Sequence, residues 1–462
     1  MSNILEQIVA NRRIEIAQLK QDLPLASFID DLAPSKKDMY QALTRTAEKP
    51  YAGFILECKK ASPSKGIIRA DFNAGEIGVI YDKYAAAISV LTEHKYFQGD
   101  FSYLKTVSDL VSCPVLNKDF FFDTYQVYLA RYYGADAVLL MLSVLSDEEY
   151  NELAAVARSL NLAILTEVSD EEECQRAITL NAKLIGINNR NLRDLSTDIS
   201  RTFDLAPTLP DDRIVISESG IYHNAQVREL APAVDGFLVG SSVMAQDDID
   251  LACRQLIYGH NKVCGLTRPE HASFAIDAGA EFGGLIFAEK SPRCIDKAQA
   301  KAIIDQNPSM KYVGVFVNHP QEKVLELAHD LQLSAVQLHG QENQEYLDNL
   351  REKLASNCQI FKALAVEQTV PTLAKNVDHI VLDGKSAGSG QAFNWQALTD
   401  SEQDLSNCFL AGGLALDNIT QACQQMTNQE LFGLDINSGV ESSPGIKCRD
   451  KLQQVFAKIR NY

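Results

Sequence analysis

Short apolar runs rich in β-branched residues recur along the whole chain and alternate with segments of helical periodicity. In the first half these runs predict strands at 53–59, 87–92, 114–120, 135–142, 162–168, 183–190, 213–220 and 236–242. The segment 146–160 is typical of the stretches between them, because its apolar residues are spaced three and four apart after an acidic first turn. Eight buried strands alternating with helices predict a closed parallel barrel of about 250 residues.

The second half repeats the pattern. Its expected strands are 261–267, 282–288, 312–317, 335–340, 360–366, 379–385, 408–414 and 431–439. We therefore expect an α/β protein with two consecutive (β/α)8 TIM barrels, at 1–257 and 258–462, the first with an N-terminal helical extension at 1–50. Gly259 can end the last helix of the first barrel. An open doubly wound sheet is the competing architecture, but the chain has no Gly-x-Gly-x-x-Gly fingerprint.

Charged and polar residues interrupt the first set of strands near their carboxyl ends. They are Glu57, Lys59, Lys118, Asp119, Glu167, Asn188, Arg190 and Glu218. One lysine or glutamate at a strand end is usually solvated or ion-paired. The strands of a parallel barrel, however, end at one mouth, where enzymes with this fold build their sites. Because each buried charge needs the others, the cluster predicts a polar site at this mouth.

Small residues follow the last two strands of each half. They are Ser219, Gly220, Gly240 and Ser241 in the first half, and Gly412, Gly413, Asn437 and Ser438 in the second. Such residues let backbone N–H groups approach a phosphate. Tight turns would explain the glycines but explain the serines less well, so we expect a phosphate site in each half.

The second half carries different candidates for catalysis. Cys264, Asp383 and Asp435 lie on its strands, and Arg293 follows the second strand. A lone buried cysteine is usually inert, but one paired with a carboxylate across a barrel mouth can form an acid–base couple. His339 fits a catalytic role and a structural hydrogen bond about equally.

Composition narrows the class of protein. The 462 residues include 43 Lys and Arg against 61 Asp and Glu, a formal charge of −18. An acidic surface disfavours nucleic acid and anionic membranes, so local cations must hold an anionic ligand. There is no run of about 18 apolar residues and no signal-peptide layout at the N-terminus. Ten cysteines without a C-x-x-C pair predict neither a zinc site nor a disulfide framework, and they fit a reducing cytoplasm.

At these residues the chain resembles two enzyme families. The first half is similar to indole-3-glycerol-phosphate synthase through ILECKKASPSKG, SVLTEHKYFQG, VLNKDFF, TEV, GINNRNL, SESGI and VGSSVM. The second half resembles phosphoribosylanthranilate isomerase through KVCGLTR, VGVFVN, VQLHG, VLDGKSAGSG, AGGL and LDINSGVESSPGIK. Together the resemblances cover nearly the whole chain, in the order of the fused bacterial tryptophan-biosynthesis enzymes.

For the second half, the resemblance implies isomerisation of N-(5-phosphoribosyl)anthranilate to 1-(2-carboxyphenylamino)-1-deoxyribulose 5-phosphate. Asp383 would be the acid, Cys264 the base, and Arg293 the bidentate partner of the anthranilate carboxylate. The other substrate-binding residues expected there are His339, Gly412, Gly413, Asp435, Asn437 and Ser438.

For the first half, the resemblance implies closure of the indole ring with loss of carbon dioxide and water. Lys118 would be the acid and Glu167 the base, with Lys59 near the substrate carboxylate or sharing the acid role. Burial among like charges is expected to lower a lysine pKa towards neutrality. The residues expected to complete this site are Glu57, Asn188, Glu218, Ser62, Phe97, Arg190, Ser219, Gly220, Gly240 and Ser241. The extension before Tyr51 would border the mouth.

Both reactions are acid–base chemistry, so we expect no cofactor and no metal. The expected partners are small phosphorylated anthranilate–sugar substrates, with no nucleic acid and no membrane, and the chain is expected to be a cytoplasmic monomer. Two alternatives remain open. In one, a single barrel is active and the other is a degenerate structural partner. In the other, the chain is a non-catalytic sensor of sugar phosphates, which would not need Lys118, Glu167, Cys264 and Asp383.

Overall fold

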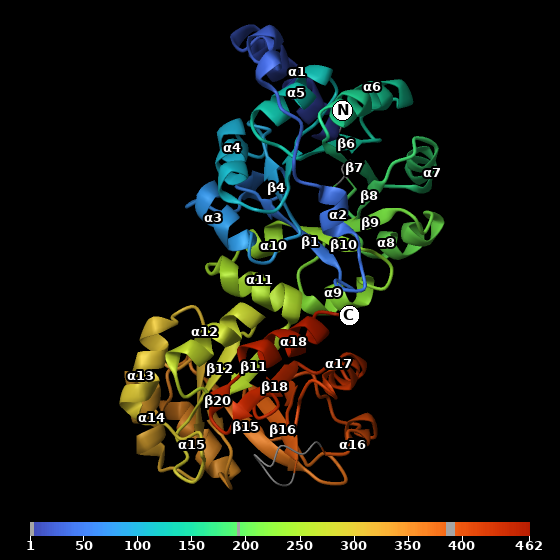
Figure 1. Ribbon diagram of the computed structural model, residues 1–462. Coiled ribbons are helices and arrows are strands. Elements are labelled where there is room, and N and C mark those ends of the chain that lie inside the picture. The colour runs from blue at the N-terminus through green and yellow to red at the C-terminus, as the bar shows by residue number, and fades with distance from the viewer. Residues whose placement is uncertain (1–3, 192–194, 385–392) are drawn as a thin grey trace. The chain divides into compact units, whose positions relative to one another are not determined.

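The structure is a computed structural model that describes residues 4–191, 195–384 and 393–462 (Figure 1). Parts of the motifs GINNRNL and VLDGKSAGSG, and the end of the strand expected at 379–385, lie outside the described residues. The chain forms two compact units, Met1–Cys253 with Tyr462 and Arg254–Asn461. Each unit contains its own closed barrel of eight strands, which confirms the predicted architecture.

The first barrel consists of parallel strands, and β1 closes it by pairing with both β10 and β4. Its strands are β1 (Gly53–Cys58), β4 (Ala87–Leu91), β5 (Val115–Lys118), β6 (Ala137–Met141), β7 (Ala163–Val168), β8 (Leu184–Asn188), β9 (Ile214–Glu218) and β10 (Gly236–Val239). Two short strands, β2 (Ala61–Ser62) and β3 (Gly66–Ile67), form a hairpin after β1.

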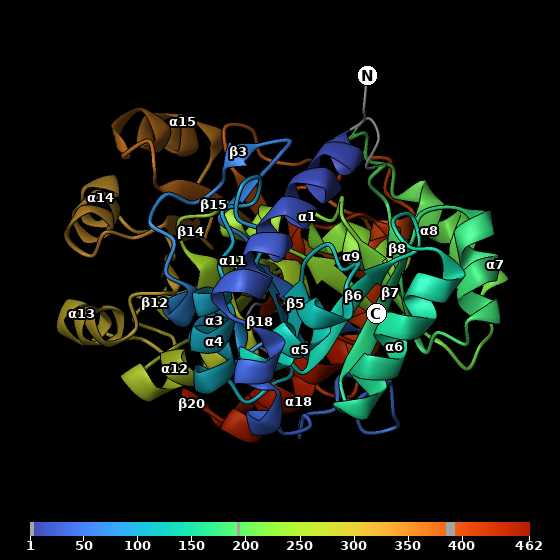
Figure 2. The ribbon, with the colours of Figure 1, turned by 90° about the horizontal axis from the view of Figure 1, so that it is seen from above.

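Helices lie outside this ring of strands (Figures 1 and 2). They are α1 (Ile4–Asp22), α2 (Met39–Leu43), α3 (Ala74–Tyr81), α4 (Phe101–Leu110), α5 (Thr124–Tyr132), α6 (Asp147–Ser159), α7 (Glu171–Thr179), α8 (Ser200–Leu205), α9 (Asn224–Leu230), α10 (Ser241–Met244) and α11 (Ile249–Tyr258), with short 3-10 turns at Leu25–Ser27, Ile29–Asp31 and Ala206–Thr208. The helix expected after 146 begins with a capping box, in which Ser146 and Glu149 each satisfy the other's backbone N–H.

The second barrel has the same closed parallel order, from β11 round to β18. Its strands are β11 (His260–Cys264), β12 (Phe282–Ile286), β13 (Lys311–Phe316), β14 (Ala335–Leu338), β15 (Gln359–Val366), β16 (His379–Gly384), β17 (Cys408–Leu410) and β18 (Gly433–Ile436). Its helices are α12 (Pro269–Ala278), α13 (Lys297–Gln306), α14 (Gln321–Asp330), α15 (Gln344–Lys353), α16 (Gln396–Thr399), α17 (Ile419–Asn428) and α18 (Arg449–Ile459). A hairpin of β19 (Glu441–Ser443) and β20 (Ile446–Lys447) follows β18.

Large side chains fill the interior of the second barrel. Phe282, Phe361 and Phe409 are fully buried, and their ring centroids lie 5.5–5.9 Å apart. The barrel is therefore a packed core, and a ligand can enter only at a mouth.

Several strands end earlier than the sequence pattern predicts. The strand expected at 213–220 ends at Glu218, because Ser219 has a φ of 68° and Gly220 a φ of 79°, which no strand accommodates. The strand expected at 114–120 likewise ends at Lys118. The side chains at these early ends are those of the predicted sites. Among the described residues, no helix is both long enough and apolar enough to cross a membrane.

Candidate active sites

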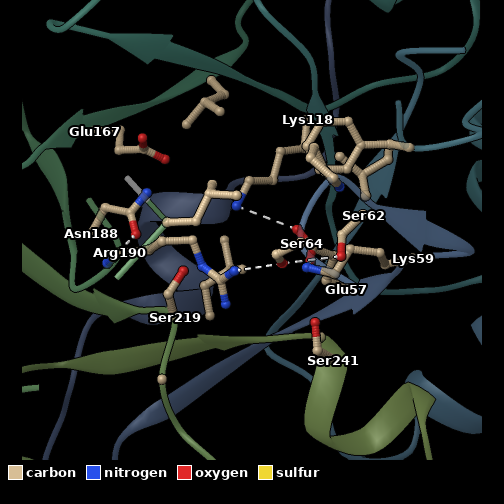
Figure 3. A pocket seen from close by; sticks show the side chains of 18 of the residues that line it. Glu57, Lys59, Ser62, Ser64, Lys118, Glu167, Asn188, Arg190, Ser219 and Ser241 are labelled. Carbon is tan, nitrogen blue, oxygen red and sulfur yellow. Dashed lines mark hydrogen bonds and ion pairs between the residues drawn. The ribbon is translucent and has the colours of Figure 1, made fainter. Parts of the chain in front are cut away.

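The carboxyl ends of the first barrel's strands surround one cavity (Figure 3). Its lining includes Glu57, Lys59, Ser62, Phe97, Lys118, Glu167, Asn188, Arg190, Ser219, Gly220, Gly240 and Ser241. Of the residues predicted for this half, only Glu218 is outside the lining. It is fully buried and contacts Lys118. The fold therefore brings these predicted residues together around one cavity.

Lys118 is held between carboxylates from two other strands. Its Nζ lies 3.3 Å from Glu57 Oε2 and 3.3 Å from Glu218 Oε2. Burial alone would lower the pKa of Lys118, but Glu57, Glu218 and Glu167 outweigh it and raise that pKa. The expectation of a lowered pKa is therefore wrong for Lys118. It holds for Lys59, whose pKa is lowered mainly by burial even though Lys59 is ion-paired with Glu57.

The two glutamates that line the cavity, Glu57 and Glu167, have different protonation behaviour. Burial would raise the pKa of Glu57, but Lys118 and Lys59 together lower it to about 2. For Glu167, burial and the charge of Glu218 raise the pKa, opposed by Lys118 and a hydrogen bond with Asn188. The site thus contains a permanent anion and a separate carboxylate whose pKa is raised towards neutral pH, which suits proton transfer.

Two glycines make room for these carboxylates. A Cβ at Gly186 on β8 would lie 1.9 Å from Glu218 Oε1, and a Cβ at Gly240 would lie 2.5 Å from Glu57 Oε1. Gly240 was predicted for phosphate binding, and this contact gives it a second reason to be glycine. The clearance at Gly186 was not predicted, because no local motif marks it.

The N-terminal extension borders the cavity, as expected. Ile4, Leu5 and Ile8 of α1 line it, and Figure 2 shows α1 (dark blue) lying over the first barrel. Ser64, which the predicted set omitted although it lies in the motif ASPSKG, accepts a hydrogen bond of 2.8 Å from Arg190 Nη1. The dashed line from Arg190 in Figure 3 marks this contact between the loop after β1 and the loop after β8.

A buried ion pair attaches α1 to the strand end that carries Lys118. Arg12 Nε donates to Asp119 Oδ1 at 3.0 Å, and both residues are buried. Asp119 also accepts from Thr92 Oγ1 at 2.5 Å and from the backbone N–H of Phe120 at 2.8 Å. Sequence reasoning placed Asp119 at the mouth but missed Arg12, since the two residues lie 107 positions apart.

The second barrel has its own cavity at the same end of its strands. It is lined by Cys264, Arg293, His339, Asp383, Gly412, Gly413, Asp435, Asn437 and Ser438, together with Gln337 and apolar side chains. All the residues predicted for this half line this cavity. Among the described residues of the chain, no group of three or more His, Cys, Asp and Glu is placed to hold a metal ion.

Cys264 is the last residue of β11, and a buried lysine precedes it on the same strand. Burial raises the pKa of Cys264, while the positive charges of Lys262 and Lys447 lower it. Lys262, fully buried two residues earlier on the same strand, donates to Asp435 Oδ2 at 2.7 Å. Asp435 lines the cavity, and its other oxygen, Oδ1, is buried without a hydrogen-bond partner in the described part of the chain.

Asp383 lies close to the predicted histidine. Its Oδ2 is 3.6 Å from His339 Nε2, and its Oδ1 accepts the backbone N–H of Gly384 at 2.7 Å. His339 Nδ1 is 3.1 Å from Gln337 Nε2, so the ring is held on both sides. This geometry places His339 beside Asp383 and leaves the two predicted roles of His339 open.

Two parallel barrels, each with titratable side chains and small-residue loops around a cavity at one mouth, are typical of an enzyme with two active sites. The family model "Indole-3-glycerol phosphate synthase" matches residues 5–256, and the model "N-(5'phosphoribosyl)anthranilate (PRA) isomerase" matches residues 261–458. The chain belongs to the family of fused enzymes that join these two domains, and it is a bifunctional enzyme of tryptophan biosynthesis with a synthase and an isomerase activity.

Known proteins match the whole chain, and solved structures match part of it. Tryptophan biosynthesis protein TrpCF of Yersinia pestis is 52% identical over 460 residues, which cover 99% of this chain and 94% of that protein. The protein of that name from Salmonella typhi is 52% identical over 465 residues, covering 100% of both chains. A crystal structure of phosphoribosyl anthranilate isomerase from Thermus thermophilus is 33% identical and covers 43% of this chain and 97% of its own, with a TM-score of 0.39.

Proposed function

We propose that the Cys264 cavity isomerises N-(5-phosphoribosyl)anthranilate to 1-(2-carboxyphenylamino)-1-deoxyribulose 5-phosphate, and that the Lys118 cavity decarboxylates and cyclises this product to indole-3-glycerol phosphate. The observation that carries the proposal is that each barrel mouth gathers its own acid, base and small-residue loops around its own cavity. Because both barrels retain their candidate acid and base residues, neither the degenerate-barrel alternative nor the sensor alternative is favoured.

In the isomerase site, Asp383 gives a proton to the ribose ring oxygen as the ring opens. Cys264 then takes the C2′ proton to leave an enolamine. This becomes the ketone when C1′ receives a proton back from Cys264 and the C2′ hydroxyl loses its proton, which restores Asp383. Removal of the C2′ proton needs the thiolate. Because burial favours the neutral thiol, the cations of Lys262 and Lys447 are the groups that support ionisation of Cys264.

In the synthase site, Lys118 protonates the ketone oxygen while the aromatic carbon bearing the carboxylate attacks the carbonyl carbon. Carbon dioxide then leaves. The hydroxyl group takes a second proton, from Lys118 after solvent has recharged it, and departs as water while Glu167 takes the proton of the adjacent carbon. The carboxylates around Lys118 keep it charged and hold it in place for donation. Lys59, beside Glu57 in the same cavity, is placed to receive the substrate carboxylate.

The phosphate group of each substrate is assigned to the loops after the last two strands of its barrel. In the second barrel Gly412 and Gly413 have φ values of 83° and 63°, a backbone form that glycine adopts freely. In the first barrel α10 begins at Ser241, and the first N–H groups of a helix have no partner within it. Both loops line their cavities, which supports the assignment.

The proposal includes residues 1–257 and 258–462 as the two functional domains, and the family matches at 5–256 and 261–458 support this division. It also includes a monomeric chain in the cytoplasm. The cysteines of the structure are all free thiols, which suits a reducing compartment. Sedimentation of the purified protein would reveal any larger assembly.

Paired variants of the full chain test the two-site assignment. We expect Lys118→Ala to reduce indole-3-glycerol phosphate formation by about 100-fold or more while isomerisation continues, and Cys264→Ala to do the reverse. Each activity is measured separately with its own substrate, so the unaffected activity serves as the control. A folded variant that lost both activities would contradict the assignment, and a variant that lost neither would support the degenerate-barrel alternative.

A further inference from the structure

The hairpin β19–β20 lies beside the isomerase cavity. Of the side chains of this hairpin, the mechanism above uses only the ammonium group of Lys447. Its turn is made by Gly445, which has a φ of 83°. Thr267 Oγ1 donates a hydrogen bond of 2.6 Å to the carbonyl of Gly445, which ties the hairpin to the loop after β11. The hairpin is therefore attached to the segment that carries Cys264.

Glu441 of this hairpin holds the arginine proposed to bind the substrate carboxylate. Arg293 Nε donates to Glu441 Oε1 at 2.9 Å, and Arg293 Nη2 donates to Glu441 Oε2 at 2.8 Å. Both residues are buried. A guanidinium has five N–H donors, and this pair uses one edge of it. A substrate carboxylate must therefore bind the remaining Nη1 and Nη2 edge, which fixes its direction of approach.

Lys447 connects the same carboxylate to the proposed phosphate loop. Its Nζ donates to Glu441 Oε1 at 2.8 Å, to the carbonyl of Asn437 at 3.0 Å and to Asn437 Oδ1 at 2.9 Å. The side chain of Lys447 is fully buried. Arg293 and Lys447 therefore share the one negative charge of Glu441. The three side chains together carry a net positive charge, which lies between the carboxylate and the phosphate of the proposed substrate.

Close packing makes this arrangement rigid. Gly265, the residue after Cys264, has a φ of 75°. A Cβ there would lie 2.6 Å from Arg293 Cδ and 2.9 Å from Asn437 Oδ1. The backbone beside the proposed base thus packs directly against both ligand-binding side chains.

We propose that Glu441 and Lys447 are positioning residues of the isomerase, which set the spacing between the carboxylate-binding edge of Arg293 and the phosphate loop at Asn437. The inference rests on the proposed function, because it takes Arg293 as the carboxylate ligand. In consequence the site selects phosphosugar amines whose aromatic ring carries an anionic group, and Glu441 matters only for substrates that have this group.

The test compares two substrates in the full chain. N-(5-phosphoribosyl)anthranilate and N-(5-phosphoribosyl)aniline, which lacks the carboxylate, are generated in situ and assayed with wild type and Glu441→Gln. We expect KM for the anthranilate compound to rise about 10- to 100-fold, with a smaller change in kcat, because a charge-assisted contact is misaligned. KM for the aniline compound should stay unchanged. Equal effects on both substrates, or no effect on either, would overturn the inference.

Two further variants serve as controls for misfolding. Glu441→Asp keeps the buried charge but is one methylene shorter, so it should show a smaller rise confined to the anthranilate compound. Ser443→Ala, at an exposed position of the same hairpin, should leave both KM values unchanged. Trp395, the one tryptophan of the sequence, is buried in the second unit, so its fluorescence reports whether that unit is folded.

The same assay separates the two claims. Wild-type protein that does not isomerise the anthranilate compound would refute the proposed function and, with it, the role of the hairpin. Wild-type protein that isomerises both compounds with equal KM would leave the activity in place and overturn the carboxylate role of Arg293 and Glu441.

Discussion

At the scale of single residues, the synthase site assigns different protonation states to chemically identical groups. Glu57 faces two lysines and has a pKa of about 2, whereas burial and the charge of Glu218 raise the pKa of Glu167. A carboxylate that stays ionised can hold a lysine, and one with a raised pKa can exchange a proton near neutrality. The charges next to each carboxylate therefore decide whether it holds a lysine or exchanges a proton.

This difference predicts the pH dependence of indole-3-glycerol phosphate formation. Glu167 acts as a base only when ionised, so kcat/KM should fall as the pH drops through a value above the ordinary glutamate pKa of about 4.3. Glu218→Gln removes a neighbouring negative charge, which lowers the pKa of Glu167 and should move this acidic limb to lower pH. Profiles of both proteins measure the shift, and the isomerase profile of the same chains should not move. A limb that stays in place or moves to higher pH would contradict the assignment.

The sequence predicted which residues line the two cavities better than it predicted their charge states. Strand-end position was enough to select Lys118 and Glu167. It did not predict that Lys118 has a raised pKa, because that depends on Glu57 and Glu218, which adjoin it only in the closed barrel. Glu441 was missed for a similar reason, since its partner Arg293 lies 148 residues away.

At the scale of elements, α1 is fastened to the synthase site through one buried ion pair. Arg12 and Asp119 are 2% and 3% exposed, and Arg12 also pairs with Glu15, so removing Arg12 would leave the buried charge of Asp119 without its cation. On α5, Tyr125 adds hydrogen bonds from its hydroxyl to the carbonyls of Leu19 and Leu23, at 3.2 and 2.8 Å. The sequence analysis predicted a helical extension at 1–50, but only the tertiary structure reveals this attachment.

We expect Arg12→Met to lower the free energy of unfolding of the first unit by about 3–5 kcal/mol. Urea unfolding followed by synthase activity measures this loss, while Trp395 fluorescence follows the second unit and should show an unchanged midpoint. Adding Asp119→Asn should recover part of the stability, because neither charge is then left alone. A loss below about 1 kcal/mol, or an equal shift of the Trp395 transition, would show that the pair does not stabilise this unit.

At the scale of the whole molecule, the repeated alternation of buried strands and helices predicted both barrels, because each half supplies the eight strands and intervening helices of a closed parallel barrel. The ends of the strands were harder to predict. Ser219 lies within the predicted strand 213–220 but adopts a left-handed backbone, which the local pattern does not show. Where a predicted strand is longer than the observed one, the extra residues therefore lie at the mouth of the barrel, next to the candidate site.

The central claim is that one chain carries two separate sites that share an intermediate, as the product of one barrel and the substrate of the other. Calorimetric titration of the full-length protein with the reduced, non-reactive form of 1-(2-carboxyphenylamino)-1-deoxyribulose 5-phosphate tests this most directly. The account predicts two molecules bound per chain, one in the cavity of Lys118 and one in the cavity of Cys264. Saturation at one molecule per chain would contradict it.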